Sequence, residues 1–274
     1  MNGLTRSLRI GTRTGLRLIA LATAVALAGT IGVGSALAAR PGAPSDSAAG
    51  PNADARHGVG RCAPLWLAAR ADPTVENWQA VGRCEIDRRL ETLSVLQARV
   101  DASVVLTDAH ERALDEILSS TQAGLRALRA EIEADTTLAE LREDITSIFE
   151  AYRVYALVVR QVWLVIGDDT VDVTADGFDA AADRLEAAID AAEAAGKDIG
   201  DAREHLAAMI RHVEAARDEV EGDAEAVLAL TPADWNDESA RPVLREARQS
   251  LADARGHLRS ALAEARQVLA EIKE

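Results

Sequence analysis

The sequence predicts an all-α protein: an elongated, antiparallel helical bundle with coiled-coil-like heptad packing and six main helices. Between Leu138 and Ile166, apolar residues recur in alternating steps of three and four, which keeps one face of a helix against its neighbours. No stretch alternates apolar and polar residues long enough for a good strand; the one rival, residues 154–166, is β-branched but carries the heptad steps. The predicted helices are joined by short links, so neighbouring helices should run antiparallel.

The N-terminus, residues 1–38, reads as a signal peptide. Four arginines precede an apolar run from Leu18 to Leu37, and Ala36-Leu37-Ala38 supplies small residues at the usual cleavage positions. The alternative is an uncleaved segment that anchors the protein, since the run is long enough to cross a bilayer. Residues 39–60 are rich in Ala, Pro, Gly, Ser and Asp, and we expect a flexible linker before a helical bundle over 61–274.

The only two cysteines, Cys62 and Cys84, are predicted to form one disulfide. An exported protein meets an oxidising compartment, and the count is even. Two free thiols, or a metal-binding pair, are the alternatives. A metal pair is disfavoured because no second cluster of His or Cys lies beside these residues.

The first three helices are predicted from cap signals. Asp72-Pro73 fits an N-cap followed by proline at the first helical position, which starts a helix ending near Ala102. Thr107 or Asp108 starts the second, to about Ala134. Thr137 and Glu140 form a capping box that opens the third helix at Leu138.

That third helix is expected to run unbroken to Ile166 and to end at Gly167-Asp168-Asp169. Apolar seams then predict three further helices and a short turn between the last two, with these approximate bounds: 171–195, 198–230, the turn at 231–235, and 239–272. The bundle is expected to be one unit, or else two three-helix units over 62–166 and 170–272.

The chemistry-bearing residues do not form a recognisable catalytic motif, and we expect no enzyme activity, no cofactor and no metal. There is no Gly-rich phosphate loop, no His-Glu-x-x-His and no Gly-x-Ser-x-Gly. His205 and His212, seven residues apart, are about 10.5 Å apart along a helix, too far for one ion without help. With Glu204 they remain an alternative as half of an interhelical metal site.

The segment from Val154 to Ile166 is apolar nearly all round, unlike an ordinary amphipathic helix. It is either the centre of the bundle or an exposed surface that binds a partner or an apolar ligand. The candidate apolar binding surface consists of Tyr155, Val159, Val162 and Trp163.

Three segments resemble a group of uncharacterised exported helical proteins of actinobacteria. The resemblance covers about residues 82–272 and is carried by Gly82–Leu90, Tyr152–Tyr155 with the apolar run after it, and Leu230–Asn236. It implies an exported, coiled-coil-like protein and carries over no activity or site residues. Relatives of this kind often have a proline near Arg160, which would imply a kink there.

The expected function is that of a secreted or envelope-associated, non-enzymatic binding or spacer module. Loss of the leader changes the formal net charge from −15 to −19, which should repel nucleic acid and anionic lipid. The expected partner is an envelope protein or polymer, not nucleic acid, and a membrane is involved only through an uncleaved leader. The alternatives are a carrier of an apolar ligand and, less favoured, a hydrolase; the oligomeric state stays open.

Overall fold

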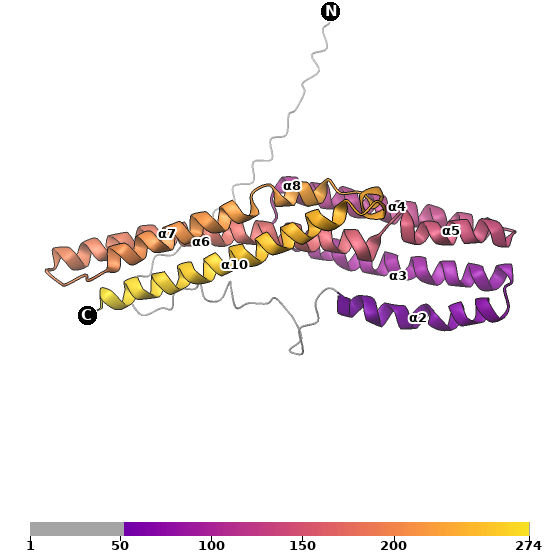
Figure 1. The fold of residues 1–274 in the computed structure, drawn as a ribbon, viewed down its shortest axis with the longest axis horizontal. Coiled ribbons are helices and arrows are strands. Elements are labelled where there is room, and N and C mark those ends of the chain that lie inside the picture. The colour runs from indigo at the N-terminus through magenta and orange to yellow at the C-terminus, as the bar shows by residue number, and fades with distance from the viewer. Residues whose placement is uncertain (1–51, 274) are drawn as a thin grey trace, which may run out of the picture. The chain divides into compact units, whose positions relative to one another are not determined.

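The computed structural model describes residues 52–273, which contain helices and no β-strand and belong to one compact unit (Figure 1). The expected signal peptide and residues 39–51 of the expected linker lie outside the described residues. The elements are α2 (Asn52–Ala71), α3 (Val75–Asp101), α4 (Asp108–Ala134), α5 (Leu138–Glu150), the π-helix η1 (Val154–Val158), α6 (Val159–Ala194), α7 (Ala202–Val220), α8 (Asp223–Leu228), α9 (Pro232–Asn236) and α10 (Ala240–Glu271).

The all-α prediction is therefore confirmed, and most predicted helix starts are correct. Thr107 caps α4, and Thr137 with Glu140 forms the predicted capping box of α5. Two starts differ. α2 begins at Asn52, within the expected linker, and α3 is capped by Thr74, whose hydroxyl accepts from the Asn77 amide, rather than by Asp72.

The predicted third helix is wrong as one unbroken rod, because the chain breaks after Glu150. Arg153 adopts a left-handed backbone with φ of 42°, and one π-helical turn follows before α6 begins. The break is stabilised from α9: Asn236 Nδ2 donates to the Glu150 carbonyl at 3.1 Å, and Arg153 Nε donates to Asn236 Oδ1 at 2.6 Å. Groups left unpaired at a helix end thus find partners distant in sequence.

The predicted stop at Gly167-Asp168-Asp169 is also wrong, since α6 runs straight through it. A side chain at Gly167 would lie 2.6 Å from Leu251 of α10, so glycine here permits close helix approach and does not end a helix. Asp169 accepts from the Thr107 amide and lies 2.7 Å from His110 Nδ1, holding the start of α4. The predicted fifth helix is divided in turn by Gly222, which has φ of 80°, into α7 and α8.

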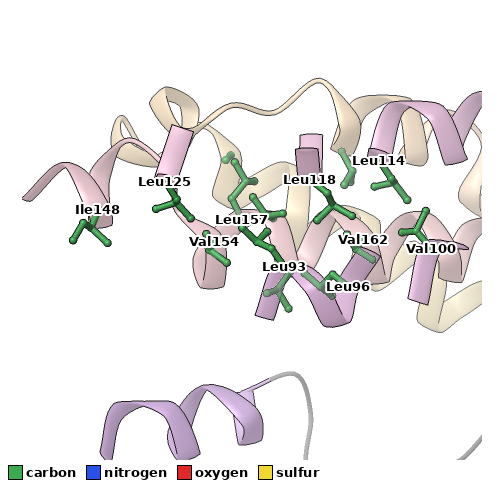
Figure 2. Packing of buried hydrophobic residues seen from close by; sticks show 14 of the residues in the cluster. Leu93, Leu96, Val100, Leu114, Leu118, Leu125, Ile148, Val154, Leu157 and Val162 are labelled. Carbon is green, nitrogen blue, oxygen red and sulfur yellow. The ribbon is translucent and has the colours of Figure 1, made fainter. Parts of the chain in front are cut away.

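Two hydrophobic cores fill the described part of the chain. The N-terminal core is built mainly from α3, α4, α5, η1 and the start of α6, and Figure 2 shows Leu93, Leu118, Leu157 and Val162 interdigitating there. The C-terminal core lies between the rest of α6, α7 and α10. Along α6 the N-terminal core ends at Ile166 and the C-terminal core begins at Val171, while Ala240, Leu244 and Ala247 of α10 also belong to the N-terminal core.

Side-chain pairs give the helix directions in the C-terminal core. Arg217 and Arg203 of α7 pair with acids of α6 in reverse order, so α6 and α7 are antiparallel. His205 and His212 of α7 meet Glu264 and His257 of α10, again in reverse order. It follows that α6 and α10 run parallel, side by side, as Figure 1 shows.

Candidate interaction surface

The four residues of the predicted apolar binding surface do not lie together on the protein surface. Val162 is fully buried and Val159 is 8% exposed, and both pack in the N-terminal core. The Tyr155 hydroxyl donates to the Arg88 carbonyl at 3.2 Å. Only Trp163 is open to solvent, 42% exposed, with the Arg99 guanidinium 4.8 Å from its ring. The apolar run is thus mostly the centre of the N-terminal core.

A buried ionic cluster lies beside Tyr155. Glu85 Oε2 accepts from both Arg88 and Arg89 at 2.7 Å, and its other oxygen accepts from Trp66 Nε1 at 3.1 Å. Burial opposes ionisation of Glu85, but the hydrogen bonds from Trp66, Arg89 and Arg88 outweigh it and hold the pKa of Glu85 below its usual value. The cluster joins α2, α3 and η1, and both carboxylate oxygens of Glu85 are bonded within the fold, while Arg88 Nε is buried without a hydrogen-bond partner among the described residues.

The predicted disulfide is present. Cys62 of α2 and Cys84 of α3 are bonded, with a Cα–Cα distance of 5.9 Å. A shallow, open depression lies over it between α2 and α3, lined by Arg61, Leu65, Ala80, Arg83, Cys84, Asp87 and Glu91. Its arginines and acids include the exposed Arg61–Glu91 ion pair, so it resembles an ordinary solvated groove.

The charges of α10 are sorted onto two sides of the helix. At 100° per residue, six exposed arginines fall within about 80° of arc, and we call them the arginine row: Arg241, Arg245, Arg248, Arg255, Arg259 and Arg266. The acids of α10 lie on the opposite flank, toward α7 and α8: Glu246, Asp253, Glu264 and Glu271. The exposed residues between the arginines of the row are alanines, such as Ala252 and Ala263.

The arginine row lies on the α6 side of α10. The Arg255 guanidinium lies close to Gly167 of α6, and Arg160 of α6 is close enough to Arg248 for the two charges to repel. Burial, and then this repulsion, lowers the pKa of Arg160, while burial and the neighbouring Arg259 lower that of Arg255. These are partly desolvated cations next to other cations.

Few carboxylates neutralise the row. Arg241 pairs with Glu238 at 2.9 Å, but within the described residues no ion pair joins the other five arginines to an acid. The α6 positions that follow Arg160 along this side at seven-residue intervals are Gly167, Thr174, Ala181 and Ala188, and none is acidic. Four acids of α6 instead pair with arginines of α7: Asp176 and Asp179 with Arg217, and Asp190 and Glu193 with Arg203.

Trp235 lies at the N-terminal end of the row, beside Arg241. Its ring lies 5.0 Å from the Arg160 guanidinium and 5.6 Å from that of Arg241. Two cations on one indole hold α9, α6 and α10 together. The ring is thereby occupied by the protein's own arginines.

A group of acids lies where α4, α6 and α8 meet. Asp168 is 9% exposed and makes no hydrogen bond or ion pair with another described residue. Burial, and then the charges of Asp172, Asp169 and Asp223, raise its pKa to about 7. Within residues 52–273, no three His, Cys, Asp or Glu side chains are placed to hold a metal ion.

The histidines considered for a metal site are separated by the fold. His205 Nδ1 lies 2.7 Å from Glu264, whereas His212 faces His257 with 3.4 Å between their Nδ1 atoms. The arginine row, by contrast, was not singled out from the sequence. Its signal was visible as arginines in steps of 4, 3, 7, 4 and 7, but the net charge of the chain conceals it.

No described helix is both long enough and apolar enough to cross a bilayer. Comparison with known proteins gave no match to a family model, and no significant match among the curated proteins or the solved structures.

Proposed function

We propose that this protein is an exported, non-enzymatic helical module that acts by binding, and that it presents its partner with a surface and not a cavity. The leader-like N-terminus and the Cys62–Cys84 disulfide support export, since disulfides persist in oxidising compartments. Continuous helical packing on both sides of α6 supports a spacer or scaffold, because it holds the two ends of the module at a fixed separation.

The observation that carries the proposal is the arginine row. A chain with a net charge of −15 places six arginines on one exposed side of one helix, and five of them have no acidic partner within residues 52–273. Exposed arginines are ordinarily interspersed with acids on a helix surface, as at Arg129 with Glu133. A segregated row supports a partner of opposite charge.

Fractionation of the native host cells tests this proposal. Wild-type protein should be found outside the cytoplasm with the disulfide formed, retained on the envelope and released by high salt. A variant with Arg248, Arg255 and Arg259 changed to glutamine should pass into the medium. Wild-type protein that stays in the cytoplasm with reduced cysteines would contradict export, and equal retention of the variant would contradict binding through the row.

The alternative of an apolar-ligand carrier has less support, because Val159 and Val162 fill the N-terminal core themselves. Native mass spectrometry of the exported protein addresses it directly. A co-purifying lipid-sized mass, lost on Val162→Phe, would favour a carrier over a surface binder.

A further inference from the structure

We infer that the arginine row of α10 binds a linear, phosphate-bearing polymer without bases, which lies along α10 beside α6. The inference deepens the proposed function by naming the partner of the same surface. It rests on the geometry of the row, on how few acids pair with its arginines, on the residues between those arginines, and on the positions of the acids of the protein.

The row has the dimensions of a line. From Arg241 to Arg266 the rise of 1.5 Å per residue gives about 38 Å, and successive arginines are about 5 to 10 Å apart. Its width is a single side chain, because the arc it occupies is narrow. A planar charged surface would meet only this one strip, whereas an extended polymer can meet every arginine in turn.

Apart from Arg241, the guanidiniums of the row have no anionic partner among the described residues, and some of them lie close to other cations. Arg160 with Arg248, and Arg255 with Arg259, are two pairs of neighbouring cations. In each pair the charge of the second arginine contributes to the lowered pKa of the first. A phosphate accepts bidentate hydrogen bonds from guanidinium forks and removes the repulsion within a pair. The choice of arginine over lysine carries no weight here, since the chain has only two lysines in all.

The residues between the arginines argue against three other occupants. A bilayer-binding helix inserts large apolar side chains, but the exposed neighbours in the row are Ala252, Ala263 and Ala270. An acidic partner helix would need an apolar strip to bury, and large exposed apolar residues of the described chain lie outside α10: Leu67, Val95, Val104, Trp163, Val173 and Ile210.

Single-stranded nucleic acid is disfavoured for a different reason. Its bases stack on exposed aromatic rings along the binding groove. Between Arg245 and Arg266 there is no aromatic residue other than His257, which faces His212 of α7. Trp235 is held between Arg160 and Arg241. The row thus presents positive charge but no exposed aromatic ring on which a base could stack.

The remaining acids oppose this binding mainly at very low salt. Glu246, Asp253 and Glu264 lie on the far flank of α10, and the α6 acids that form ion pairs with arginines do so with α7. At physiological ionic strength the Debye length is about 8 Å, so charges across a helix are largely screened from the polymer. At very low salt their repulsion is felt, and at high salt the attraction of the row is lost.

The test uses the full chain purified after export, with its disulfide formed, and long-chain inorganic polyphosphate as the probe. Wild-type protein should bind, and the affinity should fall steeply between about 50 mM and 200 mM salt, because bound cations are released. The triple variant Arg248→Gln/Arg255→Gln/Arg259→Gln should bind about 100-fold more weakly, at about 1 kcal/mol per arginine.

The matched control removes the same charge elsewhere: Arg126→Gln/Arg142→Gln/Arg211→Gln, three exposed arginines outside the row that form no ion pair with another described residue. It should bind like wild type, and circular dichroism checks the folding of both variants. No binding of polyphosphate by wild type, or an equal loss in the control, overturns the inference.

Three further probes decide the partner. Each of them should bind more weakly than polyphosphate: phosphatidylglycerol vesicles, a poly-glutamate peptide, and a single-stranded oligonucleotide of equal charge that carries all its bases. Tighter binding by any of them overturns the choice of polymer. Envelope retention without polyphosphate binding contradicts only this inference. Polyphosphate binding by a protein that is never exported sinks only the proposed function.

Discussion

The two cores of this protein are built by different means. In the C-terminal core, leucine and alanine alternate along α10 from Leu251 to Ala261, against a seam of mainly leucine, methionine and valine on α7, and no charged residue is buried in this core among those described. The N-terminal core buries Glu85, Arg88 and Arg89, is crossed by a disulfide and contains the π-helical turn. Regular packing needs only a periodic sequence, whereas irregular packing needs polar groups from distant segments to satisfy one another.

The largest predicted effect lies in the ionic cluster of the N-terminal core. Glu85→Gln should lower the free energy of unfolding by about 3–5 kcal/mol, because two buried guanidiniums lose their common anion. Chemical denaturation measures the loss, with Glu91→Gln as an exposed control that should change little. Hydrogen exchange should localise the loosening to α3 and η1. Equal loosening of α7 would show that the two cores are not distinct.

Asp168→Asn, at the junction between the cores, should raise the free energy of unfolding, in contrast to Glu85→Gln. Asp168 has a pKa of about 7, above that of an unfolded aspartate, so the folded state binds more protons and loses stability as the pH rises toward 7. Asparagine should therefore stabilise the protein at pH 8, by up to about 4 kcal/mol, and have little effect near pH 4. Denaturation at the two pH values checks this, with the exposed Asp183→Asn as control. A pH-independent effect would refute it.

Removal of the disulfide should weaken only one end of the molecule. Cys62→Ser with Cys84→Ser should cost about 3 kcal/mol, the chain-entropy estimate for a loop closed between residues 22 apart. Reduction of the wild type should reproduce this value. In hydrogen exchange, α2 should lose protection while α7 and α10 keep theirs. Global loss of protection at the same denaturant concentration would argue against independent behaviour of the two ends.

The smallest effect comes from a matched pair of glycines on α6. Gly167→Ala places a methyl group 2.6 Å from Leu251, and the overpacking should cost about 1–3 kcal/mol. Gly177→Ala meets no atom within 4 Å and should stabilise α6 by up to about 1 kcal/mol through helix propensity alone. Thermal denaturation of the two variants gives the comparison. The same sign in both would mean that α10 does not pack closely on Gly167.

The helices that the sequence predicts best are those whose partners are periodic. The seam of α10, from Leu244 to Val268, is buried as expected, because each layer repeats the last. The break after Glu150 carries no proline or glycine, and it depends on Asn236, 86 residues away. Likewise, Gly167 looks like a helix stop from its neighbours alone, and only the position of Leu251 explains it.

The candidate surface was missed for a related reason. The apolar heptad positions of this segment include Val159 and Val162, which are core residues. The arginine row needed the same projection applied to charge, which local sequence allows. The sequence alone does not tell whether acids of α6 lie next to the row, because that depends on which side of α6 faces α10. Helix pairing, and not helix content, is therefore the missing information.

α6 enters both cores as one helix of 36 residues, about 54 Å long, with no flexible joint between them. Tension applied at either end is carried by the backbone hydrogen bonds of α6, together with α10, which also packs in both cores, and not by a linker. Any bending must be taken up by α6 itself or by loss of a core. The molecule therefore transmits load as a stiff lever, and its two ends cannot turn independently of each other.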